Sequence, residues 1–202
     1  TEEQAAFRDV VRRWVDAELP KDLMRKLEAD EENYPYEIWD KLKDQGFFGI
    51  GIPEEYGGLG GDVVLQMIFA REMARTAGGL LWVWGLTSFG GAKTLTAAGT
   101  EEQRQKWLPM MAAGDLRVSL SMTEPDGGTD VLGAMKTYAD KVDGGWVING
   151  NKRFITNGGW ADWYLVLVRT GSSNDRSFGV FVVGKDDKGI SFGAKEDKMG
   201  QR

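Results

Sequence analysis

Neither cysteine nor histidine occurs in this chain of 202 residues. Their absence excludes disulfides, thiolate nucleophiles, Cys/His zinc sites and any imidazole acid or base supplied by the chain itself. We therefore expect no metal site. Carboxylates, hydroxyls and backbone amides remain for chemistry, and a bound redox cofactor becomes the more attractive source of reactivity.

Positive charges are outnumbered by negative ones, and long apolar runs are lacking. The 25 Lys and Arg residues face 31 Asp and Glu residues, for a formal net charge of −6, which argues against nucleic acid as a partner because such binding needs clustered cations. No apolar run reaches the roughly 18 residues of a membrane span, so no membrane partner is expected. Residues 1–19 mix charged and apolar side chains without the pattern of an export signal, which predicts a cytoplasmic protein.

Helical periodicity dominates the first half of the chain. It predicts helices over residues 2–19 and 36–45, a third from the cap Asp62 to about residue 77, and a fourth, apolar on every face and therefore buried, over 80–98. A fifth helix is expected after Thr100, which can form a capping box with Gln103.

The period changes to two at Leu116, where apolar and polar residues begin to alternate. Further strands are predicted at the following residues: 146–149, 153–156, 163–169 and 178–183. Turn signals at 143–145, 149–150 and 172–175 separate them. Helices followed by strands, without alternation, indicate an α+β chain with two segregated domains, which we place at 1–115 and 116–202.

The first segment that could carry chemistry is LSMTEPDGGTD at residues 120–130, where a predicted strand runs into a Pro/Gly turn. Exposed amides in such a turn, with the hydroxyls of Thr123 and Thr129, could hold a pyrophosphate or a flavin edge. Composition alone favours an ordinary turn between strands.

The second segment is INGNKRFITNGGWADWYLV at residues 148–166. A hairpin at Asn149-Gly150 is expected to lead into the strand 153–156, on which Phe154 and Thr156 would share one face. Taken alone, this pattern favours a core Phe beside a satisfied Thr.

Together and in this order, the two segments resemble the two flavin signatures of the acyl-CoA dehydrogenase family. The first signature, Thr-Glu-Pro-Gly-x-Gly-Ser-Asp, is matched at 123–130 with Asp126 in place of Gly and Thr129 in place of Ser. The second, Trp-Ile-Thr-Asn, is matched at 154–157 with Phe154 in place of Trp, which keeps an aromatic face. Other segments agree as well, so the resemblance covers essentially the whole chain: IPEEYGGLGG at 52–61, GTEEQRQKWLP at 99–109 and KEDKMGQR at 195–202.

The resemblance implies a helical amino-terminal domain, an antiparallel β-barrel-like domain after it, and FAD as cofactor. The residues that it places against the cofactor are Leu120, Ser121, Met122, Thr123, Gly128, Thr129, Phe154, Ile155 and Thr156. Among these, Phe154 would cover the flavin ring and the Thr156 hydroxyl would approach N5. For the substrate, it places Thr129 near the CoA moiety and Leu81 and Trp82 near the acyl pocket. Indoles at 82 and 84 would narrow that pocket if they face it, and core positions are an equal alternative.

The implied activity is that of an FAD-dependent oxidoreductase of fatty acid metabolism. It would introduce an α,β double bond into an acyl-CoA thioester by α-proton abstraction and hydride transfer to flavin N5. The resemblance also implies an electron-transfer flavoprotein as electron acceptor and a homo-oligomer, either a dimer or a tetramer.

The catalytic base of the family is a Glu of a carboxy-terminal helical bundle, so the resemblance places it beyond Arg202. Glu124 and Asp130 lie in turns, where we expect structural hydrogen bonding. Residues 1–202 alone are therefore expected not to dehydrogenate an acyl-CoA. Two alternatives stay open: an oxidase or monooxygenase of the same fold, and a noncatalytic scaffold that binds flavin or CoA.

Overall fold

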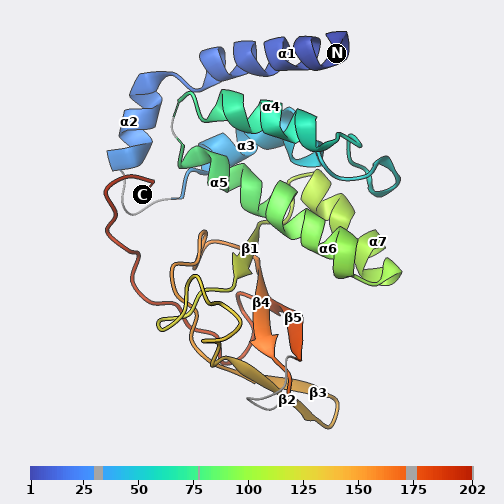
Figure 1. Ribbon diagram of the computed structural model, residues 1–202. Coiled ribbons are helices and arrows are strands. Elements are labelled where there is room, and N and C mark those ends of the chain that lie inside the picture. The colour runs from blue at the N-terminus through green and yellow to red at the C-terminus, as the bar shows by residue number, and fades with distance from the viewer. Residues whose placement is uncertain (30–33, 77, 172–176, 202) are drawn as a thin grey trace. The chain divides into compact units, whose positions relative to one another are not determined.

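The computed structural model describes residues 1–29, 34–76, 78–171 and 177–201 (Figure 1). The chain divides into two compact units, one made of Thr1–Arg117 with the segment from Lys195 onward, the other of Val118–Ala194. A helical region thus precedes a region of strands, as the change of period predicts. Within the described ranges, every helix is too short or too polar to cross a membrane.

The first unit is built from helices. Their bounds are α1 Glu2–Glu18, α2 Lys21–Ala29, α3 Tyr36–Asp44, α4 Val63–Met73, α5 Leu80–Gly85, α6 Ala92–Ala98 and α7 Glu101–Ala112, with 3-10 turns η1 Phe47–Gly49 and η2 Glu54–Tyr56. A π-helical turn, η3 (Leu86–Gly91), joins α5 to α6 where one continuous helix was predicted. The prediction also missed α2 and carried α4 too far, towards residue 77, which lies outside the described residues.

Capping explains where two helices begin. The Thr100 hydroxyl accepts from the backbone N–H of Gln103 at 3.2 Å, and the Gln103 side chain accepts from the N–H of Thr100 at 2.9 Å. The Asp62 carboxylate accepts from the N–H of Leu65 at 2.9 Å. Both caps satisfy donors that a helix leaves unpaired in its first turn, and both predictions are confirmed.

Aromatic rings fill the core of this unit. Phe69 lies between Phe47 and Trp84, with ring centroids 5.0 and 4.6 Å apart. The Trp84 indole donates to the carbonyl of Phe47 at 2.8 Å, so its polar atom is satisfied inside the core. At the edge of the core α1 and α4 lie side by side (Figure 1), joined where the guanidinium of Arg12 donates to the buried Glu72 carboxylate at 3.0 and 2.9 Å.

The Gly-rich loop between α3 and α4 is held by backbone hydrogen bonds. The N–H of Leu59 donates to Gly49 at 2.8 Å and that of Gly61 donates to Ile50 at 2.7 Å. A Cβ on Gly58 would lie 2.0 Å from the Ile52 carbonyl oxygen. The close approach of these backbones therefore requires glycine at this position.

The second unit is a five-stranded sheet in the order β1-β4-β2-β3, with β5 paired to β4. The strands are β1 Val118–Ser121, β2 Tyr138–Val142, β3 Gly145–Asn149, β4 Trp163–Arg169 and β5 Phe178–Gly184. β4 pairs parallel with β1 and antiparallel with β5, so the sheet is mixed, and among the described strands it is open. This corrects the expectation of an antiparallel, barrel-like domain. Alternation shows that a segment is a strand, but the long crossover between β1 and β4 is what makes their pairing parallel.

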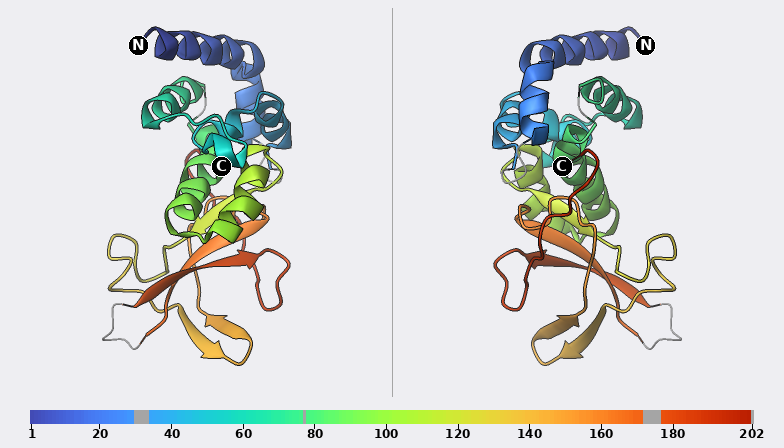
Figure 2. Two further views of the ribbon diagram at one scale, coloured as in Figure 1. Left: turned by 90° about the vertical axis from the view of Figure 1, so that its right-hand side faces the viewer. Right: turned by 90° about the vertical axis from the view of Figure 1, so that its left-hand side faces the viewer.

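The hairpin of this unit is formed by β2 and β3, and Figure 2 shows it as a paired ribbon in both views. It turns at Asp143-Gly144, where Gly144 has a φ of 81°, so this turn signal is confirmed. The predicted hairpin at Asn149-Gly150 is wrong, because Asn149 ends β3 and pairs with Tyr138 of the unpredicted β2. The predicted turn at 172–175 lies outside the described residues.

Candidate functional site

The first signature segment follows directly from β1. After Met122 and Thr123 the chain makes a tight turn, in which Glu124 and Gly127 exchange backbone hydrogen bonds of 3.1 and 3.2 Å. A Cβ on Gly127 would lie 2.5 Å from the Cβ of Ala134, so the turn packs where only glycine fits. β1 is thus followed directly by a tightly packed, hydrogen-bonded turn.

The residues beyond this turn are exposed, including Gly128 and Thr129. Asp126, which stands where the family pattern has Gly, pairs with the ammonium of Lys136 at 2.5 Å on the surface, so the turn accommodates this departure. The Asp130 carboxylate accepts from the backbone N–H of Gly133 at 3.0 Å. Such a local side-chain bond is typical of a carboxylate that stabilises a turn.

The second signature segment is not a strand, contrary to the prediction. Phe154 has a φ of 58° and Asn157 a φ of 63°, both in the left-handed region. The chain instead turns, with the N–H of Ala161 bonded to Asn157 at 2.9 Å. Phe154 and Thr156 therefore do not share the face of a strand. The β preference of Phe-Ile-Thr yields here to tertiary hydrogen bonds.

The side chain of Phe154 is 64% exposed, so most of its ring is open to solvent. Its backbone lies in a region that costs a bulky L-residue roughly 1–2 kcal/mol, and such strain clusters at functional sites. The guanidinium carbon of Arg153 lies 4.7 Å from the centre of the ring, within range of a cation–π contact. An aromatic surface is thus held in the open.

Hydrogen bonds bring the two signature segments together. The backbone N–H of Arg153 donates to the carbonyl of Thr123 at 2.8 Å. The hydroxyl of the buried Ser119, in β1, donates to the carbonyl of Thr156 at 2.5 Å. The end of β1 and the segment that carries the exposed Phe154 are therefore held side by side, although they are far apart in the sequence.

A buried carboxylate lies at this junction. Glu124, 5% exposed, accepts from the backbone N–H groups of Lys136 at 2.7 Å and Thr137 at 3.0 Å and from the ammonium of Lys152 at 2.8 Å. Burial alone would raise the pKa of Glu124, but the bonds from Lys152 and from these N–H groups lower it to about 2. Glu124 is therefore an ionised, fully engaged structural group, in agreement with the expectation that its role is structural.

Lys152 is the residue at this junction that pattern reading missed. Its ammonium also donates to the carbonyl of Met122 at 3.2 Å, and its side chain is 10% exposed. One signal was present in the sequence: a Glu in a signature turn, if buried, requires a cationic partner. Which of the many Lys and Arg residues supplies it cannot be read from local spacing.

The residues expected near an acyl group lie in the first unit. Leu81 and Trp82 belong to α5, where Trp82 is 46% exposed and Trp84 is buried in the aromatic core. Of the two Trp residues, Trp84 therefore lies in the core and Trp82 does not. The π-helical turn that follows also exposes Phe89, and such turns are frequent at functional sites.

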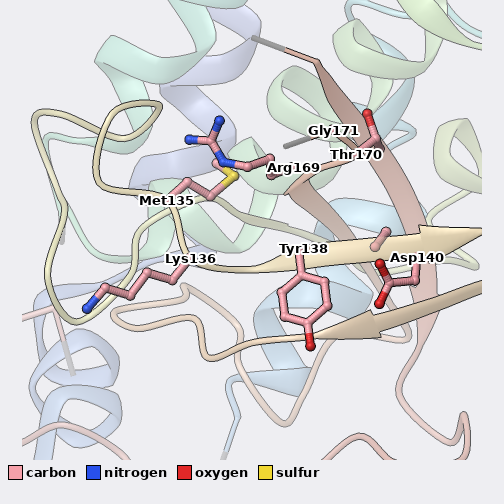
Figure 3. Close-up of a pocket in the computed structure, with 8 residues that line it drawn as sticks. Met135, Lys136, Tyr138, Asp140, Arg169, Thr170 and Gly171 are labelled. Carbon is pink, nitrogen blue, oxygen red and sulfur yellow. The ribbon is translucent and has the colours of Figure 1, made fainter. Parts of the chain in front are cut away.

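A separate pocket of about 660 Å³ opens on the second unit (Figure 3). Its walls come from the chain before and within β2 and from the end of β4: Met135, Lys136, Tyr138, Ala139, Asp140, Arg169, Thr170 and Gly171. None of these is a predicted site residue. The pocket is therefore distinct from the surface that the two signature segments form.

Comparison with known families agrees with the two signatures. The acyl-CoA dehydrogenase N-terminal domain matches residues 1–115, and the acyl-CoA dehydrogenase middle domain matches residues 119–202. The two matches follow each other in the order of the helical region and the region of strands. The chain belongs to the acyl-CoA dehydrogenase family.

Individual relatives give the same result. An acyl-CoA dehydrogenase of Bacillus subtilis is 34% identical over 201 residues, which are 99% of this chain and 52% of the relative. The butyryl-CoA dehydrogenase structure from Megasphaera elsdenii has a TM-score of 0.91 at 32% identity, covering 100% of this chain and 53% of that one. An acyl-CoA dehydrogenase from Bacillus anthracis, solved in complex with FAD, has a TM-score of 0.88 at 32% identity, covering 100% of this chain and 34% of that one. The chain spans about half the length of the first two.

Proposed function

We propose that this chain supplies the flavin-binding surface of an FAD-dependent acyl-CoA dehydrogenase. The observation that carries the proposal is the junction of the two signature segments, where Arg153 bonds to Thr123 and Ser119 bonds to Thr156. Two segments remote in sequence are fixed against each other with an aromatic ring left exposed, as a site for a large planar cofactor requires.

The residues at the junction fit a flavin. The exposed ring of Phe154 offers an apolar face for the isoalloxazine. Backbone groups of Leu120, Ser121, Met122 and Thr123, together with Ile155 and the exposed Thr156, would hold the ring's edge. The open turn at Gly128 and Thr129, where nothing lies within 4 Å of a Cβ on Gly128, leaves room for the pyrophosphate.

When bound, FAD would supply the acceptor for the hydride that leaves the β carbon of an acyl-CoA. The chain's own residues would orient the ring and exclude water from one face. Glu124 and Asp130 are engaged in structural hydrogen bonds, so neither is proposed as the base. We place that role on a Glu outside these 202 residues.

Membership of the family supports an acyl-CoA thioester as the substrate, but it does not indicate the length or branching of the acyl group. Thr129 is proposed to contact the CoA moiety, and Leu81 and the exposed Trp82 to line the acyl pocket. An oxidase of the same fold, or a noncatalytic scaffold, would use the same flavin surface. An electron-transfer flavoprotein as acceptor, a homo-oligomer, a cytoplasmic location and the division into domains 1–115 and 116–202 also remain predictions.

Anaerobic mixing of the FAD-loaded, full-length protein with short, medium and branched acyl-CoA substrates tests the proposal. Bleaching of the flavin absorbance by at least one of them, with formation of the enoyl-CoA, is the expected result. If FAD binds in full stoichiometry and none of these thioesters reduces it, the noncatalytic scaffold would be favoured. Rapid reoxidation by oxygen after bleaching would favour the oxidase.

A further inference from the structure

The junction of the two signature segments contains an ion pair that lies almost wholly out of solvent. The Glu124 and Lys152 side chains are 5% and 10% exposed and their charged atoms are 2.8 Å apart. Surface pairs contribute little, whereas a buried pair must be fully hydrogen-bonded to offset the loss of hydration. Burying such a pair destabilises the fold unless the remaining donors and acceptors of both groups are also hydrogen-bonded.

The other bonds of the pair lead to the backbone of the first signature segment and to the backbone just before β2. The Lys152 ammonium donates to the carbonyl of Met122 as well as to Glu124, so one cation holds two residues of the first segment. Because Lys152 directly precedes Arg153, whose N–H bonds to Thr123, the second segment is fixed at two neighbouring positions. Glu124 in turn fixes the N–H groups of Lys136 and Thr137 at the approach to β2.

We propose that the Glu124–Lys152 pair is a positioning clamp that sets the flavin-binding surface before the cofactor arrives. Neither side chain is expected to touch the flavin, because both are almost wholly buried and their charged groups are already engaged. The clamp acts by holding the carbonyl of Met122 and the position of Arg153, which fixes the exposed ring of Phe154 relative to the end of β1. A preformed surface binds more tightly because less order must be imposed on binding. This inference rests on the proposed function.

Lys152→Met tests the clamp, since it removes the charge and the donors while keeping a long apolar stem. Lys136→Met is a matched control: the Lys136 ammonium lies on the surface, paired with Asp126, and the backbone N–H that reaches Glu124 survives the substitution. FAD titration of the full-length apoprotein should show affinity weakened about tenfold or more by Lys152→Met and about twofold or less by the control. Lys152→Arg, which keeps a cation, should restore most of the affinity.

A readout without FAD separates positioning from cofactor contact. Hydrogen exchange of the Arg153 amide in the apoprotein reports the bond to Thr123 directly. The clamp predicts that Lys152→Met accelerates this exchange and that Lys136→Met does not. Unchanged exchange together with FAD affinity within about twofold of the unmodified protein would overturn the inference.

If Lys152→Met alone fails to fold, the double substitution Glu124→Gln with Lys152→Met can replace it in these measurements, because the double variant has no uncompensated buried charge. The clamp predicts a folded protein that still binds FAD weakly. Recovery of normal FAD affinity in the double variant would assign the pair to stability alone. Failure of the unmodified protein to bind FAD would instead refute the proposed function, whatever the variants do.

Discussion

The buried Glu124 carboxylate should make the second unit sensitive to acid. Its pKa is lowered from 4.5 to about 2 in the folded chain. Because one pKa unit corresponds to about 1.4 kcal/mol, ionised Glu124 contributes about 3 kcal/mol to the free energy of unfolding at neutral pH. The folded pKa is the lower one, so this contribution is complete above about pH 4.5 and is lost as the pH falls towards 2.

Glu124→Gln removes the ionisable group and so isolates this effect. Urea unfolding of the full-length protein and the variant, followed by circular dichroism from pH 7 to pH 3, should show the variant less stable at pH 7. The difference should shrink steadily below about pH 4.5, because Glu124 then takes up a proton in the unfolded protein while it stays ionised in the folded protein down to about pH 2. The Gln variant has no such proton uptake. Glu102→Gln, at an exposed position of α7, controls for the loss of a surface charge. A difference between protein and variant that stays constant down to pH 3 would refute the assigned role of the carboxylate.

Three further predictions concern the site and the residues that support it. Phe154→Gly should be more stable to urea than Phe154→Ala by about 1 kcal/mol, because only glycine relieves the positive φ, and equal stability would contradict the strain. Trp84→Phe should lower the free energy of unfolding by about 1–3 kcal/mol, by leaving the carbonyl of Phe47 unpaired in the core, whereas Trp82→Phe should leave stability unchanged and shift acyl-CoA preference. Thr156→Val should slow flavin reduction in stopped flow more than it weakens acyl-CoA binding, and an unchanged rate at normal flavin content would limit its hydroxyl to a structural role.

Local patterns predicted the elements whose determinants are local. The capping box of Thr100 and Gln103 places the start of α7 correctly, and the predicted strand at 163–169 coincides with β4, whose Tyr164, Val166 and Val168 alternate into the core. β2 was missed because most of its residues are exposed and its sequence, YADKV, has no apolar alternation. The helix at 80–98 was read as continuous because no local signal marks a π-helical turn.

The site was predicted in its residues and not in its geometry. Strand propensity predicts that 153–156 belongs to a sheet. In the structure the segment is not a strand, because Phe154 has a left-handed backbone and the carbonyl of Thr156 accepts from the Ser119 hydroxyl. Lys152 and Glu124 are separated by many residues, and only the fold shows them to be partners. Such long-range pairing depends on tertiary structure, which periodicity does not report.

Hydrogen exchange across the whole backbone, with and without FAD, tests the central claim most directly. If the joined signatures form the flavin site, FAD should slow amide exchange at 120–123, 128–129 and 153–156 in the full-length protein, while the hairpin of β2 and β3 serves as an internal reference and is unaffected. Binding of FAD without protection of either signature segment would contradict the account.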